Sequence, residues 1–248
     1  MELFYTARQN IDLNASSLVV DGDEFHHLIR VLRKKKGEMI LVTDGNGLSC
    51  KVQIVEVGQL SLEGKIITHS LVERPKTNVT VALSLLKNPQ RFEWFLEKST
   101  ELGISSIIPM ITLRTFFHPL SREKVQSRLK RWNSIVLSAA RQSKRYYLPQ
   151  LIEPISFSQV CSLNGYDFKL IPYELSKEAP VVYCSGKNTI FMIGGEGGFT
   201  ADEIQAAKSA GFYEISLGQT ILRAETAGVF VVAMVRAQLF GEMSQRWF

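Results

Sequence analysis

The hydrophobic positions of the first 70 residues mostly alternate with polar ones, which is typical of half-buried strands. Residues 39–43, 49–55 and 60–67 follow this pattern. Asp44-Gly-Asn-Gly47 separates the first two runs, and Asp-Gly and Asn-Gly steps there are strong hairpin signals. One helix is expected over residues 23–33, because four apolar residues share one face: Phe25, Leu28, Ile29 and Leu32. These features predict a small β-barrel with one helix.

Further along the chain, the pattern changes to strands that alternate with helices. The predicted strands are residues 79–86, 104–111, 189–193 and 213–217. Asn88-Pro89 offers an N-cap and a proline at the first helical position, and the helix that follows ends at Gly103. A capping box, Thr200-Ala-Asp-Glu203, begins a second helix.

Repeated strand–helix units imply an α/β fold with a mostly parallel sheet that helices cover on both faces. An apolar helix is expected from about residue 223 to 240, with part of it in the core and the rest available for a dimer contact. The polar segment 73–78 contains a proline and is read as a linker. The sequence therefore predicts two domains, residues 1–72 and 73–248.

The net charge of +5 is unevenly distributed. Residues 1–72 hold 8 Lys+Arg and 9 Asp+Glu, so the excess of positive charge lies in the remainder of the chain. Two basic clusters stand out, at Arg30 to Lys36 and at Arg122 to Arg145. A single cluster is typical of a solvated helix face, but two of them in a basic chain indicate a polyanionic partner, most plausibly nucleic acid.

Other classes of protein are disfavoured by the sequence. The first residues lack the basic start and long apolar run of a signal peptide, and the apolar run 227–235 is too short to cross a bilayer. Cys50, Cys161 and Cys184 are far apart and have no metal-ligand spacing. We therefore expect a cytoplasmic protein with no membrane segment and no metal.

Two glycine-marked loops carry the candidate chemistry. Gly194-Gly-Glu-Gly-Gly198 lies between a predicted strand and a capped helix, as anion- or nucleotide-binding loops do. It matches neither the phosphate-binding loop nor the dinucleotide fingerprint. Its glycines would let the backbone approach a flat ligand, whereas a tight turn would need only one. Two glycine-rich strand exits predict a ligand at the carboxyl edge of the sheet.

The second loop, Leu217 to Ala227, places Arg223, Glu225 and Thr226 at the start of a helix. These residues fit a catalytic site. An alternative is that Glu225 only complements the helix dipole and pairs with Arg223.

These two loops resemble the paired signatures of the ribosomal RNA small subunit methyltransferase E family, which belongs to the SPOUT superfamily of knotted methyltransferases. The matching strings are Ile193-Gly-Gly-Glu-Gly-Gly-Phe-Thr200 and Leu217-Gly-Gln-Thr-Ile-Leu-Arg-Ala-Glu-Thr-Ala227. Further similar segments occur in order along nearly the whole chain: Lys98-x-x-Glu-Leu-Gly103 with Ile107-Ile-Pro109, Ala139-Ala-Arg-Gln-Ser-Lys-Arg145 with Pro149, and His26-His-Leu-x-x-Val-Leu-Arg33.

One position departs from the family pattern. The family usually has proline where this chain has Gly195, and glycine should loosen the loop and lower the affinity for the cofactor. Residues 151–188 match the family only weakly.

The resemblance implies methylation of N3 of a uridine in 16S rRNA with S-adenosylmethionine as the methyl donor. It implies a C-terminal SPOUT domain with a deep trefoil knot, an exception to the usual unknotted topology, and an N-terminal PUA-like β-barrel that binds RNA. Three loops would hold the cofactor, through Leu170, Pro172, Tyr173, Glu174, Ile193, Gly194, Gly195, Glu196, Gly197, Gly198, Ser216, Leu217, Gly218, Ile221 and Leu222.

The imide nitrogen of uridine must lose its proton, so a cation and a base are expected beside the cofactor loop. Arg223 is the predicted cation, and Glu225 is predicted to orient it or to accept the proton. The predicted RNA-binding residues are Arg30, Arg33, Lys34, Lys35, Gln142, Ser143 and Arg145. Gln142 and Ser143 equally fit the role of caps at a helix end.

The expected partners are 16S rRNA or the assembled small subunit, and a second copy of the chain in a homodimer. Two other readings stay open. The protein could methylate a ribose 2′-hydroxyl or a tRNA, or it could be a non-catalytic RNA-binding assembly factor with a vestigial cofactor pocket.

Overall fold

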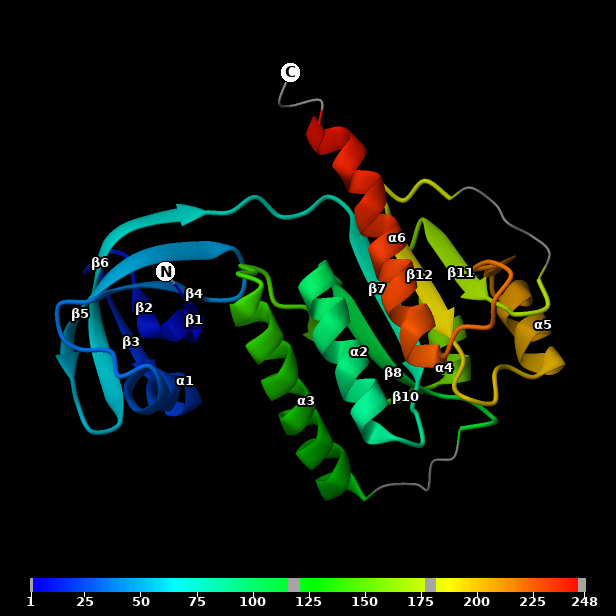
Figure 1. Ribbon diagram of the computed structural model, residues 1–248, viewed down its shortest axis with the longest axis horizontal. Helices are drawn as coiled ribbons and strands as arrows, with labels where there is room; N and C mark the ends of the chain where they lie inside the picture. Colours follow the sequence, from blue (N-terminus) through cyan, green and yellow to red (C-terminus); the bar gives the residue numbers. More distant parts are fainter. Residues whose placement is uncertain (1, 116–120, 177–181, 245–248) are drawn as a thin grey trace. The chain divides into compact units, whose positions relative to one another are not determined.

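Contacts within the chain divide it into two units, which Figure 1 shows. The computed structural model describes residues 2–115, 121–176 and 182–244, with side chains as far as residue 239. Unit 1 contains the residues up to Arg74 together with Ala140–Leu148, and unit 2 contains Pro75–Ala139 and the residues from Pro149 onward. The domain boundary predicted at residues 72 and 73 stays a prediction.

Unit 1 is built on a six-stranded sheet in the order β1-β4-β5-β6-β3-β2. The strands are β1 (Leu3–Tyr5), β2 (Ile11–Asp12), β3 (Ser17–Asp21), β4 (Met39–Thr43), β5 (Leu48–Val57) and β6 (Ser61–Leu71). The β1–β4 pair is parallel, and the other pairs are antiparallel. The alternating pattern is confirmed: the buried residues of β5 are Leu48, Cys50, Val52 and Ile54.

The helix predicted over residues 23–33 is divided into α1 (Gly22–His26) and the π-helical segment η2 (His27–Val31), and a short 3₁₀ helix, η1 (Arg8–Asn10), precedes them. Phe25 and Leu28 are buried in the core of this unit, as the pattern predicted. Residues 140–148 join the unit by backbone pairing, since Gly47 N donates to Tyr146 O at 2.9 Å and Leu148 N donates to Gly45 O at 3.0 Å.

Unit 2 is built on a parallel sheet in the order β10-β8-β7-β12-β11-β13, with β9 paired to β8. Its strands are β7 (Asn78–Ser84), β8 (Ser106–Ile111), β9 (Gln150–Leu151), β10 (Ile155–Ser156), β11 (Phe168–Pro172), β12 (Asn188–Ile193) and β13 (Tyr213–Ile215). The helices are α2 (Pro89–Leu102), α3 (Arg122–Gln142, whose last turn belongs to unit 1), α4 (Phe157–Cys161), α5 (Ala201–Ser209) and α6 (Ala224–Ser244).

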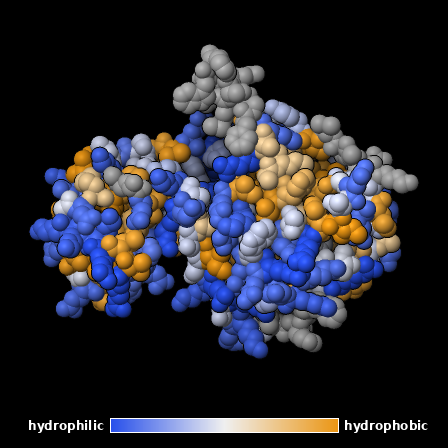
Figure 2. Space-filling model, viewed as in Figure 1, coloured by the Kyte–Doolittle hydropathy of each residue, from blue (hydrophilic) through white to orange (hydrophobic). Residues whose placement is uncertain are grey.

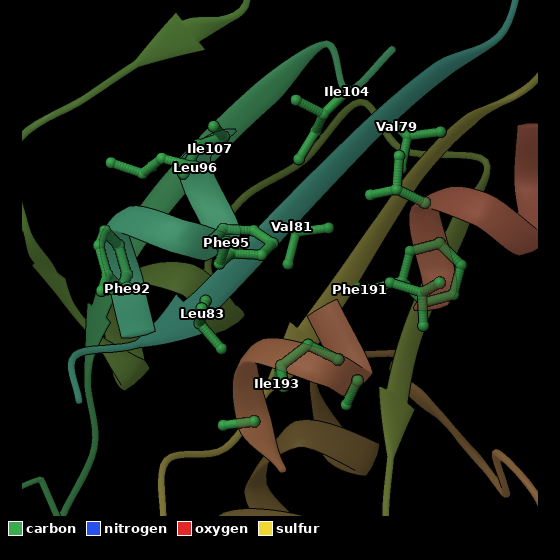
Figure 3. Close-up of a cluster of buried hydrophobic side chains, with 14 of the residues drawn as sticks. Val79, Val81, Leu83, Phe92, Phe95, Leu96, Ile104, Ile107, Phe191 and Ile193 are labelled. Carbon is green, nitrogen blue, oxygen red and sulfur yellow. The ribbon is translucent and has the colours of Figure 1, made fainter. Parts of the chain in front are cut away.

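Helices cover both faces of this sheet, which confirms the α/β prediction. On one face, side chains of α2, α3 and α6 pack against alternate residues of β7 and β12, among them Val81 and Phe191. Figure 3 shows part of this cluster, with Phe95 of α2 beside Val81 of β7. Phe92 and Leu96 of the same helix belong to the cluster as well. On the other face, α4 and α5 pack against the intervening strand residues.

The predicted helix ends are confirmed by their hydrogen bonds. The side chain of Asn88 accepts a bond from Gln90 N at 2.9 Å, and Gly103 ends α2 with a φ of 99°. Thr200 and Glu203 form a complete capping box at the start of α5. Glu203 also accepts a bond from Leu113 N at 2.8 Å, so this cap fixes the loop after β8 as well.

Candidate functional site

A pocket opens where β11, β12 and β13 end, because the carboxyl ends of parallel strands meet at the same edge of a sheet. Including the open space at its mouth, it encloses about 750 Å³. The lining residues are Pro172, Tyr173, Glu174, Ile193, Gly194, Gly195, Gly198, Phe199, Ser216, Leu217, Gly218, Gln219, Thr220, Ile221, Leu222, Ala224 and Ala227.

Most of the predicted cofactor residues therefore line one pocket, and three do not. Leu170 is buried within β11. The carboxylate of Glu196 turns to the backbone and accepts a hydrogen bond from Lys87 N at 3.1 Å. Gly197 packs against the side chain of Arg114.

Some lining residues were missed by the sequence reasoning. Ala224 and Ala227 belong to the first turn of α6. Residues three apart lie on the same face of a helix, and this pair directly follows the predicted loop that begins at Leu217, so their spacing could have identified them. Phe199, Gln219 and Thr220 adjoin predicted residues in the same loops.

The glycines of the 194–198 loop let other parts of the protein itself pack closely against the loop backbone. A Cβ atom on Gly194 would lie 3.1 Å from the backbone of Gly198, and one on Gly195 would lie 3.1 Å from Ser84 Oγ. The guanidinium of Arg114 holds the loop by donating to Gly197 O at 2.7 Å. The loop is therefore pinned by intramolecular contacts.

Arg223 and Glu225 lie in a separate groove on the other side of the first turn of α6. The groove is lined by Asn88, Gln90, Arg91, Trp94, Arg223, Glu225 and Thr226. Glu225 is only 6% exposed, and its Oε1 lies 3.7 Å from Nε of Arg91. Its Oε2 is buried and makes no hydrogen bond within the described residues.

Glu225 pairs with Arg91, and no ion pair between Glu225 and Arg223 occurs among the described residues. Glu225 does lie in the first turn of α6, where the alternative has it complement the helix dipole. Arg223 is exposed at the residue before α6. Arg91 was missed because its role depends on contact between α2 and α6, which are more than 120 positions apart in the sequence and leave no local signal.

A second hollow lies on the other side of the start of α2. Its floor is apolar and includes Phe92 and Trp132, whose ring centroids are 4.9 Å apart. At its rim, Arg131 makes a two-pronged ion pair with Glu93 at 2.5 and 2.8 Å.

All seven predicted RNA-binding residues belong to unit 1, since residues 140–148 group with it. Arg30, Arg33 and Lys35 are exposed, and Lys34 pairs with Glu38 at 3.1 Å. The segment of Gln142, Ser143 and Arg145 is held to the unit because the hydroxyl of Tyr5 donates to Arg145 O.

Within the described ranges, no group of three or more His, Cys, Asp or Glu side chains could hold a metal ion. No helix in the described part of the chain is long and apolar enough to cross a membrane.

Comparison with known proteins gives consistent matches to both units. A family model described as an RNA methyltransferase domain matches residues 73–236, and one described as an RNA methyltransferase PUA domain matches residues 20–67. The ribosomal RNA small subunit methyltransferase E of Synechocystis sp. is 33% identical over 225 residues, which are 87% of this chain and 71% of the relative.

Two solved structures resemble the chain over most of its length. The ribosomal RNA small subunit methyltransferase E of Neisseria gonorrhoeae, bound to S-adenosyl methionine, has a TM-score of 0.84 and 28% identity, with 96% of this chain and 97% of that chain covered. A putative methyltransferase of Legionella pneumophila in complex with the same cofactor has a TM-score of 0.84 and 26% identity, covering 95% and 96%. The chain therefore belongs to the ribosomal RNA small subunit methyltransferase E family of RNA methyltransferases.

Proposed function

We propose that this protein transfers the methyl group of S-adenosylmethionine to N3 of a specific uridine in the 16S rRNA of the small ribosomal subunit. The observation that carries the proposal is the pocket at the ends of β11, β12 and β13, together with a polar groove on the other side of the first turn of α6. Relatives named ribosomal RNA small subunit methyltransferase E support the choice of RNA.

The pocket suits an adenosyl group joined to a charged amino-acid tail. Ile193, Phe199, Leu217 and Leu222 give it apolar walls for a flat ring. Among the described residues, Glu174 is the one acidic residue in the lining, and it is exposed. It would therefore hold the cationic end of the cofactor. When bound, S-adenosylmethionine supplies a methyl group on a positively charged sulfur. The trefoil knot that the resemblance implies stays a prediction.

The groove supplies the groups that this chemistry needs on the RNA side. Arg223 would stabilise the negative charge that spreads onto the oxygens of the base when the imide loses its proton. Glu225 has one oxygen beside Arg91 and one without a partner in the described chain, and an unpartnered carboxylate oxygen suits a proton acceptor. We therefore assign Glu225 the role of base in preference to the role of orienting Arg223.

The decisive experiment is methylation of purified small subunits in vitro, with the modified nucleotide mapped and its nucleoside identified by mass spectrometry. We expect 3-methyluridine at one position of 16S rRNA. A 2′-O-methylated nucleoside or a methylated tRNA would replace this proposal by the corresponding alternative. Calorimetry with S-adenosylmethionine tests the non-catalytic alternative, since a vestigial pocket would give no binding.

The assignment of the two residues is tested by Arg223→Ala and Glu225→Gln. Loss of a stabilising cation or of a general base typically lowers turnover by about a hundredfold or more. We expect such a loss with an unchanged affinity for S-adenosylmethionine, because neither residue lines the pocket. Variants that methylate at the normal rate would refute these roles.

We also propose that the protein is a homodimer. Five apolar residues in the described part of α6 are buried within the unit, namely Ala224, Ala227, Val231, Val232 and Val235, but Phe230 is exposed. Figure 2 shows hydrophobic surface on the side where α6 lies. An exposed apolar area of this kind is typical of a contact with another chain. Light scattering at micromolar concentration should give the mass of two chains. The mass of one chain would contradict the proposal.

A further inference from the structure

We propose that the groove between α2 and the start of α6 is the subsite for the methylated base, with Trp94 as its stacking surface and Arg91 as the residue that positions Glu225. This inference rests on the proposed function, because it concerns the place where the RNA base lies during the reaction. It adds two residues of α2 that the signature loops do not contain.

The unpartnered oxygen of Glu225 is the first observation. A buried carboxylate oxygen without a hydrogen bond is costly, so such groups normally have a donor. Within the described chain, Oε2 of Glu225 has none, and the residue lines the groove. This oxygen is shielded from solvent as the side chain stands, so a ligand reaches it when Glu225 turns toward the groove. The ring N–H of a nucleobase is a donor that the oxygen would then accept.

Arg91 explains how the carboxylate is held in this position. Its Nε lies 3.7 Å from Oε1 of Glu225, so this oxygen already has a cationic partner within the protein. One oxygen is thus fixed by a cation, while the other is left for the base. Arg91 acts through Glu225: it fixes the position of the Glu225 carboxylate and offsets its negative charge.

Trp94 forms an open aromatic wall of the same groove. Its side chain is 43% exposed, although it lies in a helix whose neighbours Phe92 and Phe95 are fully buried. Aromatic side chains on which bases stack are a general means of holding an unpaired nucleotide. The amide side chains of Asn88 and Gln90, which also line the groove, offer further hydrogen bonds to a base edge.

The groove is in the right place for a base that receives a methyl group. Ala224 and Ala227 line the cofactor pocket, whereas Arg223, Glu225 and Thr226 line the groove. Leu222 lines the pocket and the next residue, Arg223, lines the groove, so the two adjoin where the chain enters α6. A base at this end of the groove would lie next to a cofactor in the pocket.

Trp94 is tested with two RNA fragments that differ only at the methylated position, one intact and one lacking the base. For Trp94→Ala, we expect the affinity for intact RNA to fall about tenfold, while the affinity for the abasic RNA stays the same. Trp94→Phe should keep most of the preference because it keeps a ring. Equal loss for both fragments would overturn the role of Trp94, as would a change in dimer dissociation without a change in RNA preference.

Arg91 is tested by Arg91→Met and Arg91→Lys, with Lys98→Met as the matched control, since Lys98 lies on the same helix and pairs with Glu97 and Glu101. We expect Arg91→Met to lower kcat at least tenfold with little change in KM, and Arg91→Lys to recover most of the rate. Binding of S-adenosylmethionine should be unchanged in all three. A rate that Arg91→Met leaves at the wild-type level, or that Arg91→Lys does not recover, would overturn the role of Arg91.

A third experiment uses the unaltered protein and does not depend on the folding of variants. RNA that carries photoreactive 5-iodouridine at the methylated position is bound and irradiated, and the cross-linked peptide is identified by mass spectrometry. The expected peptide contains Trp94. A cross-link confined to residues outside the groove would overturn the subsite while leaving methylation, and hence the proposed function, intact.

Discussion

In the loop of residues 194–198, Gly195 lies directly against the side chain of Ser84. A Cβ atom on Gly195 would lie 3.1 Å from Ser84 Oγ, which is hydrogen-bonded to Thr115 at 2.8 Å and to Thr112 at 3.3 Å. The proline that the family resemblance places at position 195 would therefore meet a buried hydroxyl.

This coupling predicts the effect of restoring proline. Gly195 is outside the set of glycines with a positive φ, so it does not adopt the left-handed backbone that proline cannot adopt. We expect Gly195→Pro to destabilise the protein by about 1 kcal/mol through crowding. In a Ser84→Ala background the same change should be neutral or stabilising by about 0.4–1 kcal/mol. Urea unfolding measures both, and equal effects in the two backgrounds would show that the residues are not coupled.

At the scale of elements, α2 and α6 pack closely because Gly228 has no side chain. A Cβ atom on Gly228 would lie 2.7 Å from the ring of Phe95, which is fully buried. This approach also brings Arg91 of α2 within reach of Glu225 of α6. The helix contact and the chemistry of the groove therefore depend on the same glycine.

Gly228→Ala tests this contact. Alanine favours a helix over glycine by about 1 kcal/mol, yet we expect a net loss of about 1–3 kcal/mol in the free energy of unfolding because the added methyl meets Phe95. Combining it with Phe95→Leu should give a double variant more stable than the sum of the single effects predicts, by at least about 0.5 kcal/mol. Additive effects would exclude the clash.

A second contact between elements holds the last turn of α3. Arg141 donates to Glu24 Oε1 at 3.0 Å, and Tyr5 N donates to Glu24 Oε2 at 3.2 Å. Burial raises the pKa of Glu24 above its ordinary value, and the charge of Arg141 opposes that rise. The carboxylate is therefore kept ionised largely by its partner.

Arg141→Met should leave this carboxylate buried and unpaired, at a cost of about 3 kcal/mol near pH 7. A carboxyl whose folded pKa is raised binds protons more tightly in the folded state, so acidification favours folding. We expect the cost to shrink as the pH falls from neutral toward the raised pKa of Glu24, where the carboxyl takes up a proton. Denaturant unfolding across this range measures it, with Arg141→Lys as the control. A cost that is independent of pH would contradict this account.

At the scale of the whole molecule, the basic residues predicted to bind RNA and the site of methyl transfer are assigned to different units. The pocket and the groove lie in unit 2, whereas all the predicted RNA-binding residues lie in unit 1. Residues 140–148 reach unit 1 from the middle of the chain, so the unit that carries these residues is not one continuous stretch of sequence.

Arg33→Glu tests the contribution of unit 1. Phosphate contacts add affinity that falls with salt, so we expect weaker binding to small-subunit RNA and a salt dependence that is reduced by about one contact. Lys65→Glu makes the same change of charge on an exposed position of β6 and is the control. An RNA affinity equal to that of the unaltered protein would remove Arg33 from the binding surface.

Much of the fold was determined by local pattern. Alternation in β5, the Asn88 cap of α2, the capping box at Thr200 and the apolar run of α6 each depend on residues close together in the sequence. Strands that end in glycine loops meet at one edge of a parallel sheet, so most of the pocket lining followed as well. The break between α1 and η2 was missed, because a shared apolar face does not reveal the type of helix.

The partners of side chains from distant segments were decided only by the tertiary structure. The sequence placed Glu225 beside Arg223 at the start of a helix, but its ion pair is with Arg91. Ser84 beneath Gly195, Phe95 against Gly228 and Arg114 on the glycine loop are of the same kind. Local periodicity and capping fix which elements form. Which side chains meet between them depends on how the elements pack, and a single sequence carries no direct record of that packing.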